Sequence, residues 1–580
     1  MFSRIGQLIF DNEAVAKTSD FTMGLEIEMQ RVDETGHISQ EPYPAGIGDE
    51  KTNPWLTNDY LETMAEMVTP SAKHALDAMH YLYVINNTLR SALAPGELLW
   101  PLSMPPKLPK DKTQLRFAKM GPKKEAYLKE WTKRHGYSKG TPCGAHINLS
   151  IDSHVIQLVL DKCGDQFKDE VAVRNHLYTV LAQGFVRYRW FITYLFGASP
   201  IAEENYFAPG HELAHPIRSI RQSSHGFGTK FAGDYTNVQR YVDRIEEGVK
   251  QGILTSDYEF HDSVRFKGNE NLKQLPQTGV EYLELRMLDL DPSSSVGVRT
   301  GTLRFIRLLA SYFIMHPALK DDEVNPVLDL ANQMNEVVAE ESPTAACHYR
   351  TKALALIKHL ERYANQIQLG PEYAEILEDL EDRVINPATT PSAKLLNYVQ
   401  DGSLTAYALR RAKRYQEAAL ETIQPFKGFE DGRVYTAAEL RAALAQNKKT
   451  GGKVPPVFLL GCPLDQVCKE PLGIIIVLEH ILRVPLDGEN AVVGDGLNCL
   501  GHLVVGHRRD PECGRNLVKG LVVTGVNVGA PTDQLEDPAV LFNGDVVGGQ
   551  VARGCLSMFE GLTRVLRQVL VDRTTKGDVD

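Results

Sequence analysis

Three short segments in the first 290 residues alternate apolar and polar side chains with a period of two. They are GLEIEMQ (24–30), HINLSI (146–151) and YLELRML (282–288). Successive side chains of a strand point to opposite faces, so each segment would present one apolar and one polar face. This is typical of an antiparallel sheet with one face on a core and one face open. The predicted polar faces carry Glu26 and Glu28; His146, Asn148 and Ser150; and Tyr282, Glu284 and Arg286.

Other segments have the spacing of helices. Apolar residues from Ala75 to Leu89 recur every three or four positions, and so do those of TLRFIRLLASYFIM (302–315) and EYAEILEDLEDRV (372–384). Residues 300–421 are therefore predicted to be mostly helical. Together with the strands, this predicts an α+β fold in which an antiparallel sheet is joined to a mostly helical part.

Composition narrows the class of protein. The 580 residues exceed one ordinary core, so two or more domains are expected. A net charge of −11 leaves no overall basic field for nucleic acid or an anionic membrane. Neither a signal peptide nor a membrane span is expected, and the eight Cys include no CxxC pair. We expect a cytoplasmic protein with reduced thiols, whose partners are small molecules.

The composition changes near residue 425. Residues 426–580 hold 21 of the 46 Gly but only one of the 22 Tyr. Aromatic side chains supply much of the packing in a core, so this tail would pack differently from the rest. We predict two domains, 1–425 and 426–580, and assign no function to the second.

The polar faces suggest a metal site. Carboxylates two residues apart on one strand face, as in Glu26 and Glu28, repel each other unless a cation neutralises them. Mg²⁺ prefers carboxylate and phosphate oxygens, and a single His among carboxylates is compatible with Mg²⁺ or Mn²⁺. For any one segment, a solvated strand face is the simpler interpretation; three such faces together weaken it.

Further charged residues have two interpretations each. Asp59, Glu62 and Glu66 lie in NDYLETMAEMVTP, whose spacing favours an ordinary acidic helix start, although an extended segment would turn Glu66 to one side. Basic residues beside a carboxylate cluster suit a nucleotide triphosphate or an acyl phosphate, although lone basic residues are usually solvated. The candidates are Arg218, Arg221, Arg265 and Lys267. The chain has no GxxxxGK[ST] motif and no GxGxxG after a clear strand, so neither a P-loop nor a Rossmann turn is expected.

Six motifs in order resemble the bacterial glutamate–cysteine ligase family, and most closely the ligase half of the bifunctional glutathione synthases of Gram-positive bacteria. They are GLEIEMQRV (24–32), NPWLTNDYLETMAEMVTP (53–70), LLWPLSMPP (98–106), GTPCGAHINLS (140–150), HPIRSIRQSSHGF (215–227) and EYLELRMLDLDP (281–292). The resemblance covers about residues 10–425. It implies a curved sheet of the glutamine synthetase and guanido kinase type, whose open face binds ATP and Mg²⁺.

The resemblance also implies roles for individual residues. The family's metal ligands fall on Glu26, Glu28, Asp59, Glu66, His146 and Glu284. A phosphate-binding arginine falls on Arg286, a substrate-carboxylate or phosphate arginine on Arg221, and a tyrosine near the substrate on Tyr127. Independently of the resemblance, Arg265 and Lys267 share one face of a short strand in SVRFKG and are expected to contact substrate. Glu284 is expected to serve catalysis with Arg286. The chain has Leu128 where some relatives have Arg, and Phe227 where some have Tyr.

The implied reaction is the ATP- and Mg²⁺-dependent joining of L-glutamate to L-cysteine through γ-glutamyl phosphate, the first step of glutathione biosynthesis. In bifunctional relatives an ATP-grasp domain follows, but no ATP-grasp motif is evident in the last 155 residues. Three alternatives stay open: a γ-glutamyl ligase for another amine, a truncated non-catalytic copy of a bifunctional enzyme, and a metal-dependent hydrolase.

Overall fold

The computed structural model describes seven stretches of the chain. They are residues 2–12, 21–226, 231–269, 271–422, 425–447, 502–509 and 516–524. The chain divides into two compact units, Met1–Pro455 and Pro456–Asp580. In the second unit the described residues form one antiparallel pair, β8 (His502–Arg509) with β9 (Asn516–Thr524).

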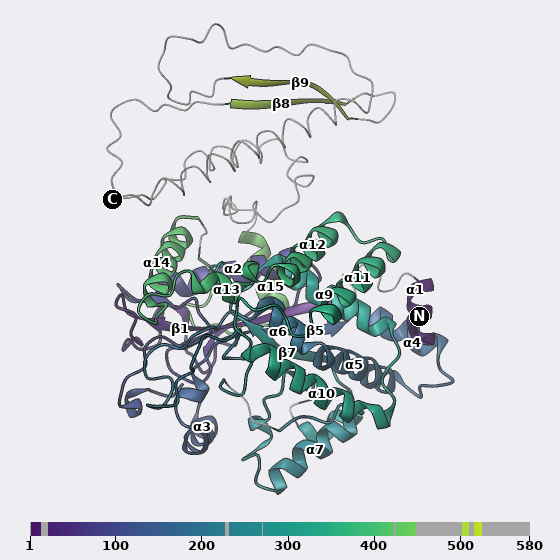
Figure 1. Ribbon diagram of the computed structural model, residues 1–580, viewed down its shortest axis with the longest axis horizontal. Helices are drawn as coiled ribbons and strands as arrows, with labels where there is room; N and C mark the ends of the chain where they lie inside the picture. Colours follow the sequence, from purple (N-terminus) through teal and green to yellow (C-terminus); the bar gives the residue numbers. More distant parts are fainter. Residues whose placement is uncertain are drawn as a thin grey trace. The chain divides into compact units, whose positions relative to one another are not determined.

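The first unit is built on a seven-stranded sheet. The strands follow the order β2-β3-β1-β5-β7-β6, β4 pairs with β1, and every pairing is antiparallel. Figure 1 shows β1, β5 and β7 crossing the middle of this unit. The strands are β1 (Phe21–Val32), β2 (Leu56–Asn58), β3 (Met64–Val68), β4 (Leu98–Leu99), β5 (Gly144–Ile151), β6 (Val264–Lys267) and β7 (Tyr282–Asp289).

The three alternating segments form the three central strands, as predicted. In β1 the apolar residues Leu25, Ile27 and Met29 are almost completely buried, and the other strands repeat this burial on the same side. The expectation of a helix around Glu62 and Glu66 is wrong, because residues 64–68 form strand β3. β3 pairs with β1 on one side and with β2 on the other, and these hydrogen bonds favour a strand. They depend on distant parts of the chain, so the local spacing of residues could not predict them.

Helices cover the apolar side of the sheet. Helix α2 packs on β1 and β3, α5 on β6 and β7, and α6 on β7, while α9 packs on α2 and α5 (Figure 1). The predicted helical region 300–421 is confirmed as α9 to α14. The main helices are α1 (Arg4–Asp11), α2 (Ala75–Ala92), α3 (Pro122–His135), α4 (Ser153–Lys162), α5 (Glu170–Arg187), α6 (Arg189–Phe196), α7 (Val238–Lys250), α8 (Leu275–Thr278), α9 (Thr300–Met315), α10 (Asp321–Glu340), α11 (Arg350–Gln366), α12 (Pro371–Ile385), α13 (Pro391–Leu396), α14 (Thr405–Thr422) and α15 (Ala437–Asn447).

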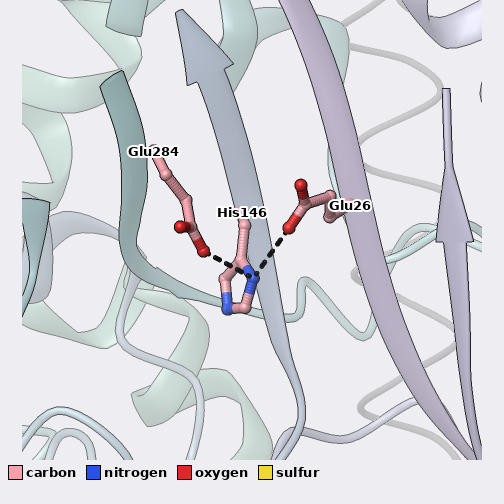
Figure 2. A group of neighbouring side chains, drawn as sticks. All are labelled: Glu26, His146 and Glu284. Carbon is pink, nitrogen blue, oxygen red and sulfur yellow. Dashed lines mark ion pairs between the residues drawn. The ribbon is translucent and has the colours of Figure 1, made fainter. Parts of the chain in front are cut away.

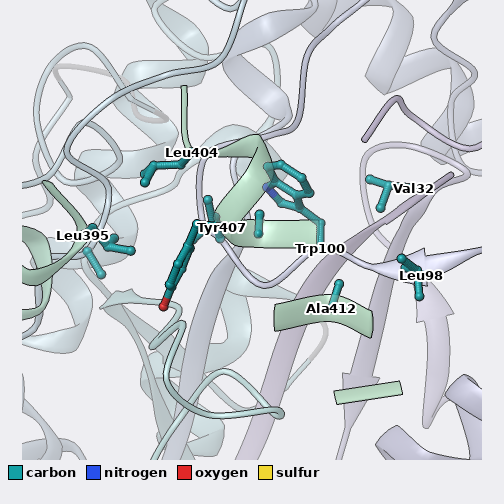
Figure 3. Close-up of a cluster of buried hydrophobic side chains, with 10 residues drawn as sticks. Val32, Leu98, Trp100, Leu395, Leu404, Tyr407 and Ala412 are labelled. Carbon is teal, nitrogen blue, oxygen red and sulfur yellow. The ribbon is translucent and has the colours of Figure 1, made fainter. Parts of the chain in front are cut away.

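A second apolar cluster joins α14 to the end of the sheet. Trp100 is fully buried in it beside Val32 of β1 and Leu98 of β4, and its indole Nε1 donates to Met104 O at 2.9 Å (Figure 3). Tyr407 and Ala412 of α14 pack on the same cluster. Residues around 400 are therefore part of the core that supports β1.

The first unit continues past the compositional change near residue 425. Trp55 Nε1 donates to Tyr435 O at 3.0 Å, and His80 Nε2 lies 3.3 Å from Leu444 O in α15. The predicted tail, residues 426–580, lies largely outside the described residues, so its organisation stays a prediction. No helix within the described ranges is long and apolar enough to cross a bilayer.

Candidate active site

Strand register gathers the polar residues of five strands on the open face of the sheet. Glu26 of β1 stands directly opposite His146 of β5, and Glu28 stands opposite Glu66 of β3. On the other side of β5, Asn148 stands opposite Glu284 of β7. The next strand, β6, places Arg265 opposite the same Glu284. Directly opposed residues have Cβ atoms only about 5 Å apart, so these side chains share one site.

The centre of the site is an imidazole between two carboxylates (Figure 2). His146 Nδ1 lies 3.6 Å from Glu26 Oε2 and 3.9 Å from Glu284 Oε1. One ligand atom of each residue lies within 4.8 Å of the other two. On the other edge of the ring, Nε2 lies 3.8 Å from Glu28 Oε1. The three predicted strands therefore bring Glu26, Glu28, His146 and Glu284 together.

Two further carboxylates, Asp59 and Glu66, extend the site towards β2 and β3. Burial and the negative charges of Glu26, Asp59 and Glu28 raise the pKa of Glu66 well above its usual value. Burial acts in the same direction on Asp59, but the positive charges of Lys124 and Arg286 hold the pKa of Asp59 below its usual value. Asp59 and Glu66 are thus close enough to the other predicted metal ligands for their charges to interact.

This donor set fits a hard divalent cation. It offers carboxylate oxygens and one imidazole, which suit Mg²⁺ and Mn²⁺. Asn148 Nδ2 donates to Glu26 Oε1 at 2.7 Å, whereas its buried Oδ1 has no hydrogen-bond partner in the described part of the chain. The raised pKa of Glu66 also records crowding of negative charge that a bound cation would relieve.

Basic side chains border the carboxylates along β6 and β7. Lys267 Nζ lies 2.9 Å and Arg265 Nη1 3.5 Å from Glu284 Oε2, while Arg286 Nη1 pairs with Glu284 Oε1. Arg286 Nη1 also lies 3.4 Å from His146 Nδ1. Burial opposes ionisation of Glu284, but the charges of Arg286, Arg265 and Lys267 hold its pKa well below the usual value. Glu284 therefore lies where the carboxylate cluster of the site meets its basic side chains.

Arg221 reaches the same face from a separate loop. Its Nη1 donates to Leu288 O at 2.9 Å and to Arg286 O at 3.2 Å, and its Nη2 lies 3.3 Å from His146 Nε2. The guanidinium fills the space beside Gly144, where an added Cβ would lie 1.8 Å from Nη2. A glycine at the start of β5 is therefore required for Arg221 to enter the site.

Tyr127 of α3 stands at the edge of the site. It is half-buried, and its ring centroid lies 6.4 Å from that of Tyr258. Burial and the charges of Glu259 and Asp59 raise its pKa. The neighbouring Leu128 is buried against the core, and Phe227 lies outside the described residues.

Two acidic or basic candidates have structural roles instead. Glu62 is buried and pairs with Lys119 Nζ and Arg116 Nε, each at 2.9 Å, away from the carboxylate cluster. Arg218 is buried and pairs with Glu341 Oε2 at 3.2 Å, at the end of α10. Their charges are satisfied by these partners.

Two residues of the site, His261 and Lys124, were not predicted from the sequence. His261 lies four residues before Arg265 and continues the alternation of β6 backwards, a signal present in HDSVRFK (261–267). Its Nδ1 lies 2.8 Å from Glu259 O. Burial and the charges of Arg286 and Arg265 lower its pKa to about 3. Lys124 lies on α3 with its Nζ 3.3 Å from Asp59 Oδ1, and no strand periodicity could have indicated it.

Comparisons with known proteins identify the family of this chain. The family model described as glutamate-cysteine ligase matches residues 7–251 and 229–335. The glutathione biosynthesis bifunctional protein of Streptococcus thermophilus is 31% identical over 430 residues, which are 74% of this chain and 56% of that protein. The chain therefore spans about half the length of the curated relatives it matches.

Solved structures show the same fold. A bifunctional glutathione synthetase from Pasteurella multocida has a TM-score of 0.66 at 29% identity, over 72% of this chain and 55% of that one. A glutamate–cysteine ligase from Francisella tularensis, solved in complex with AMP, has a TM-score of 0.63 at 22% identity, over 74% of this chain and 93% of that one. Because the family model matches more than half of its residues, this chain belongs to the glutamate–cysteine ligase family.

Proposed function

We propose that this chain uses ATP to join the γ-carboxylate of L-glutamate to the amine of L-cysteine, forming γ-glutamylcysteine. The observation that carries the proposal is the meeting of a carboxylate cluster with Arg286, Arg265 and Lys267 on one open sheet face. Membership of the family supports the substrates, and the relatives' names link the product to glutathione biosynthesis.

The reaction requires activation of a carboxylate. A carboxylate oxygen is a poor leaving group, so it first attacks the γ-phosphorus of ATP, and ADP departs. The resulting γ-glutamyl phosphate carries a good leaving group. The cysteine amine then attacks the acyl carbon, phosphate leaves, and the nitrogen loses a proton to give the amide.

Glu26, Glu28, Asp59, Glu66, His146 and Glu284 would hold the divalent cation. When bound, such a cation neutralises phosphate oxygens and so lowers the cost of charge development during phosphoryl transfer. Mg²⁺ is the cation we propose, because carboxylate oxygens predominate in the donor set; the one imidazole makes Mn²⁺ an effective substitute.

The basic residues would orient the anionic reactants. Arg286 would hold the transferring phosphoryl group with its planar guanidinium, a role supported by the pairing of Arg286, Arg265 and Lys267 with the same carboxylate of Glu284. Arg221 is fixed by two carbonyls and presents Nη2 towards His146, a position suited to the carboxylate or phosphate of a substrate. Tyr127, at the edge of the site, would contact the amine substrate.

The test is ADP release by the purified chain with ATP, L-glutamate, L-cysteine and Mg²⁺, with the product identified by mass spectrometry. We expect γ-glutamylcysteine in equal amount to ADP, and a lower rate when 2-aminobutyrate replaces cysteine. Faster turnover with another amine would identify a ligase of different specificity. No ADP release with any amine would contradict the proposal and favour a non-catalytic copy.

The same preparation tests two of the remaining expectations. Adding glycine with γ-glutamylcysteine asks whether the chain also makes glutathione, a step to which we assign no residues. ATP hydrolysis without amide formation would favour the metal-dependent hydrolase. Cytoplasmic location and the lack of nucleic-acid and membrane partners stay predictions.

A further inference from the structure

Among the described residues of this site, Lys124 is the one cation that comes from a helix beside the sheet. Its Nζ lies 3.3 Å from Asp59 Oδ1, and it belongs to the first turn of α3, which also carries Tyr127. Burial lowers the pKa of Lys124, but the charges of Asp59 and Glu66 raise it overall. The ammonium therefore lies against Asp59 and close to Glu66, and the charge of Arg286 also acts on Asp59.

Lys124 is also the most exposed cation of the site. Its side chain is 36% exposed and that of Asp59 is 40% exposed, whereas Arg286 is 16% exposed. Water or a ligand can therefore reach both side chains and replace either partner of the Lys124–Asp59 pair. A lysine carries a compact charge on a flexible stem, which suits such an exchange better than a rigid guanidinium does.

Resident basic side chains already offset most of the acidic charge of the site. Five basic side chains, Lys124, Arg221, Arg265, Lys267 and Arg286, face six acidic ones, Glu26, Glu28, Asp59, Glu66, Glu284 and Asp289. A divalent cation that enters alone is therefore repelled by these basic side chains, and Lys124 is the one that pairs with Asp59.

We propose that Lys124 is an exchangeable counter-ion. It neutralises Asp59 in the metal-free enzyme, leaves Asp59 when the divalent cation binds, and then contacts a phosphate oxygen of the nucleotide. The last step rests on the function proposed above, whereas the first two concern the protein and a metal ion alone. The consequence is a coupling: the metal binds more weakly alone than with nucleotide, because phosphate gives Lys124 a new partner.

The test is a Mn²⁺ titration followed by electron paramagnetic resonance, on the full chain without substrates. Removing one positive charge a few ångströms from the ion should lower the Mn²⁺ dissociation constant of Lys124→Met by about tenfold relative to wild type. Lys124→Arg keeps the charge, so its dissociation constant should stay within about twofold of wild type. Repeated with a non-hydrolysable ATP analogue, the titration should show a smaller gain in affinity for Lys124→Met than for wild type.

Lys119 provides the matched control, because it pairs with Glu62 at 2.9 Å outside the cluster. Lys119→Met should leave the Mn²⁺ dissociation constant unchanged, and circular dichroism should show that each variant is folded. The inference is overturned if Lys124→Met binds Mn²⁺ no more tightly than wild type, if Lys119→Met has the same effect, or if wild type binds no Mn²⁺ with or without the analogue. Failure of ADP release by wild type would instead overturn the proposed function, since the titration uses no reaction.

Discussion

Replacing Arg286 by alanine tests the catalytic role that we propose for its guanidinium. The change removes one guanidinium from Glu284 and from the neighbourhood of His146. Glu284 keeps Lys267 at 2.9 Å and Arg265 at 3.5 Å, so the buried carboxylate does not lose all its positive partners. We therefore expect the fold to survive, with a loss of unfolding free energy below about 2 kcal/mol.

The kinetic effect follows from the charge and its burial. The Arg286 side chain is only 16% exposed, so solvent screens it in part. A unit charge about 4 Å from a developing opposite charge is worth about 4 kcal/mol at an effective dielectric constant near 20. Removing a single positioned group of this kind typically lowers kcat by about 10²–10³. We expect this loss in Arg286→Ala, and a smaller loss in Arg286→Lys, which keeps charge without the planar fork.

The assay is steady-state ADP release with L-glutamate and L-cysteine, alongside chemical unfolding of each variant. Arg116→Ala is the control, because Arg116 pairs with Glu62 at 2.9 Å and lies outside the carboxylate cluster. Its kcat should be close to that of wild type. A kcat for Arg286→Ala within about threefold of wild type would refute the role that the electrostatic argument assigns to Arg286.

Three further substitutions test other parts of the account. Glu284→Gln removes a charged candidate ligand and should raise the Mg²⁺ concentration for half-maximal activity by at least about tenfold; an unchanged titration would make Glu284 structural. Gly144→Ala places a Cβ 1.8 Å from Arg221 Nη2, so activity should fall by about tenfold or more, and a normal KM for L-glutamate would exclude a substrate role for Arg221. Glu97→Ala leaves the buried Arg31 without its carboxylate at 2.6 Å and should cost about 3–5 kcal/mol of unfolding free energy in urea; a cost below 1 kcal/mol would contradict that argument.

Each of these changes has a matched control on the same chain. Glu281→Gln alters an exposed acid three residues from Glu284 and should not change the Mg²⁺ titration. Gly24→Ala adds a Cβ on β1 whose nearest contacts are at 3.6 Å, so activity should be retained. Glu130→Gln removes an exposed pair with Lys133 at 3.0 Å, for which about 0.5 kcal/mol is the expected cost.

Much of the fold was predictable because alternation with period two is a direct consequence of strand geometry. The central strands β1, β5 and β7, and the helices after residue 300, were predicted from apolar spacing alone. Alternation says which residues share a face, but it does not say which strands are neighbours. The pairing of Glu26 with His146, and of Glu28 with Glu66, is a property of the sheet order. The three polar faces suggested a metal site without a family, but only the resemblance indicated that Asp59 and Glu66 belong to it.

The errors and omissions have equally specific causes. Strand β3 has five residues, too few to distinguish strand from helix by spacing, and its pairing with β1 decided the outcome. His261 precedes the regular part of β6, so its place in the alternation was easily overlooked. Lys124 reaches Asp59 from a helix, and the two residues lie 65 positions apart in the sequence, so this contact has no local signal.

The central claim is that separated strands form one divalent-cation site beside Arg286. Anomalous diffraction from crystals grown with Mn²⁺ and a non-hydrolysable ATP analogue tests it most directly. We predict an anomalous peak ligated by at least two of Glu26, His146 and Glu284, with the analogue's phosphates towards Arg286. Mn²⁺ bound only at other residues of the chain, while the nucleotide occupies the open face of the sheet, would contradict the account.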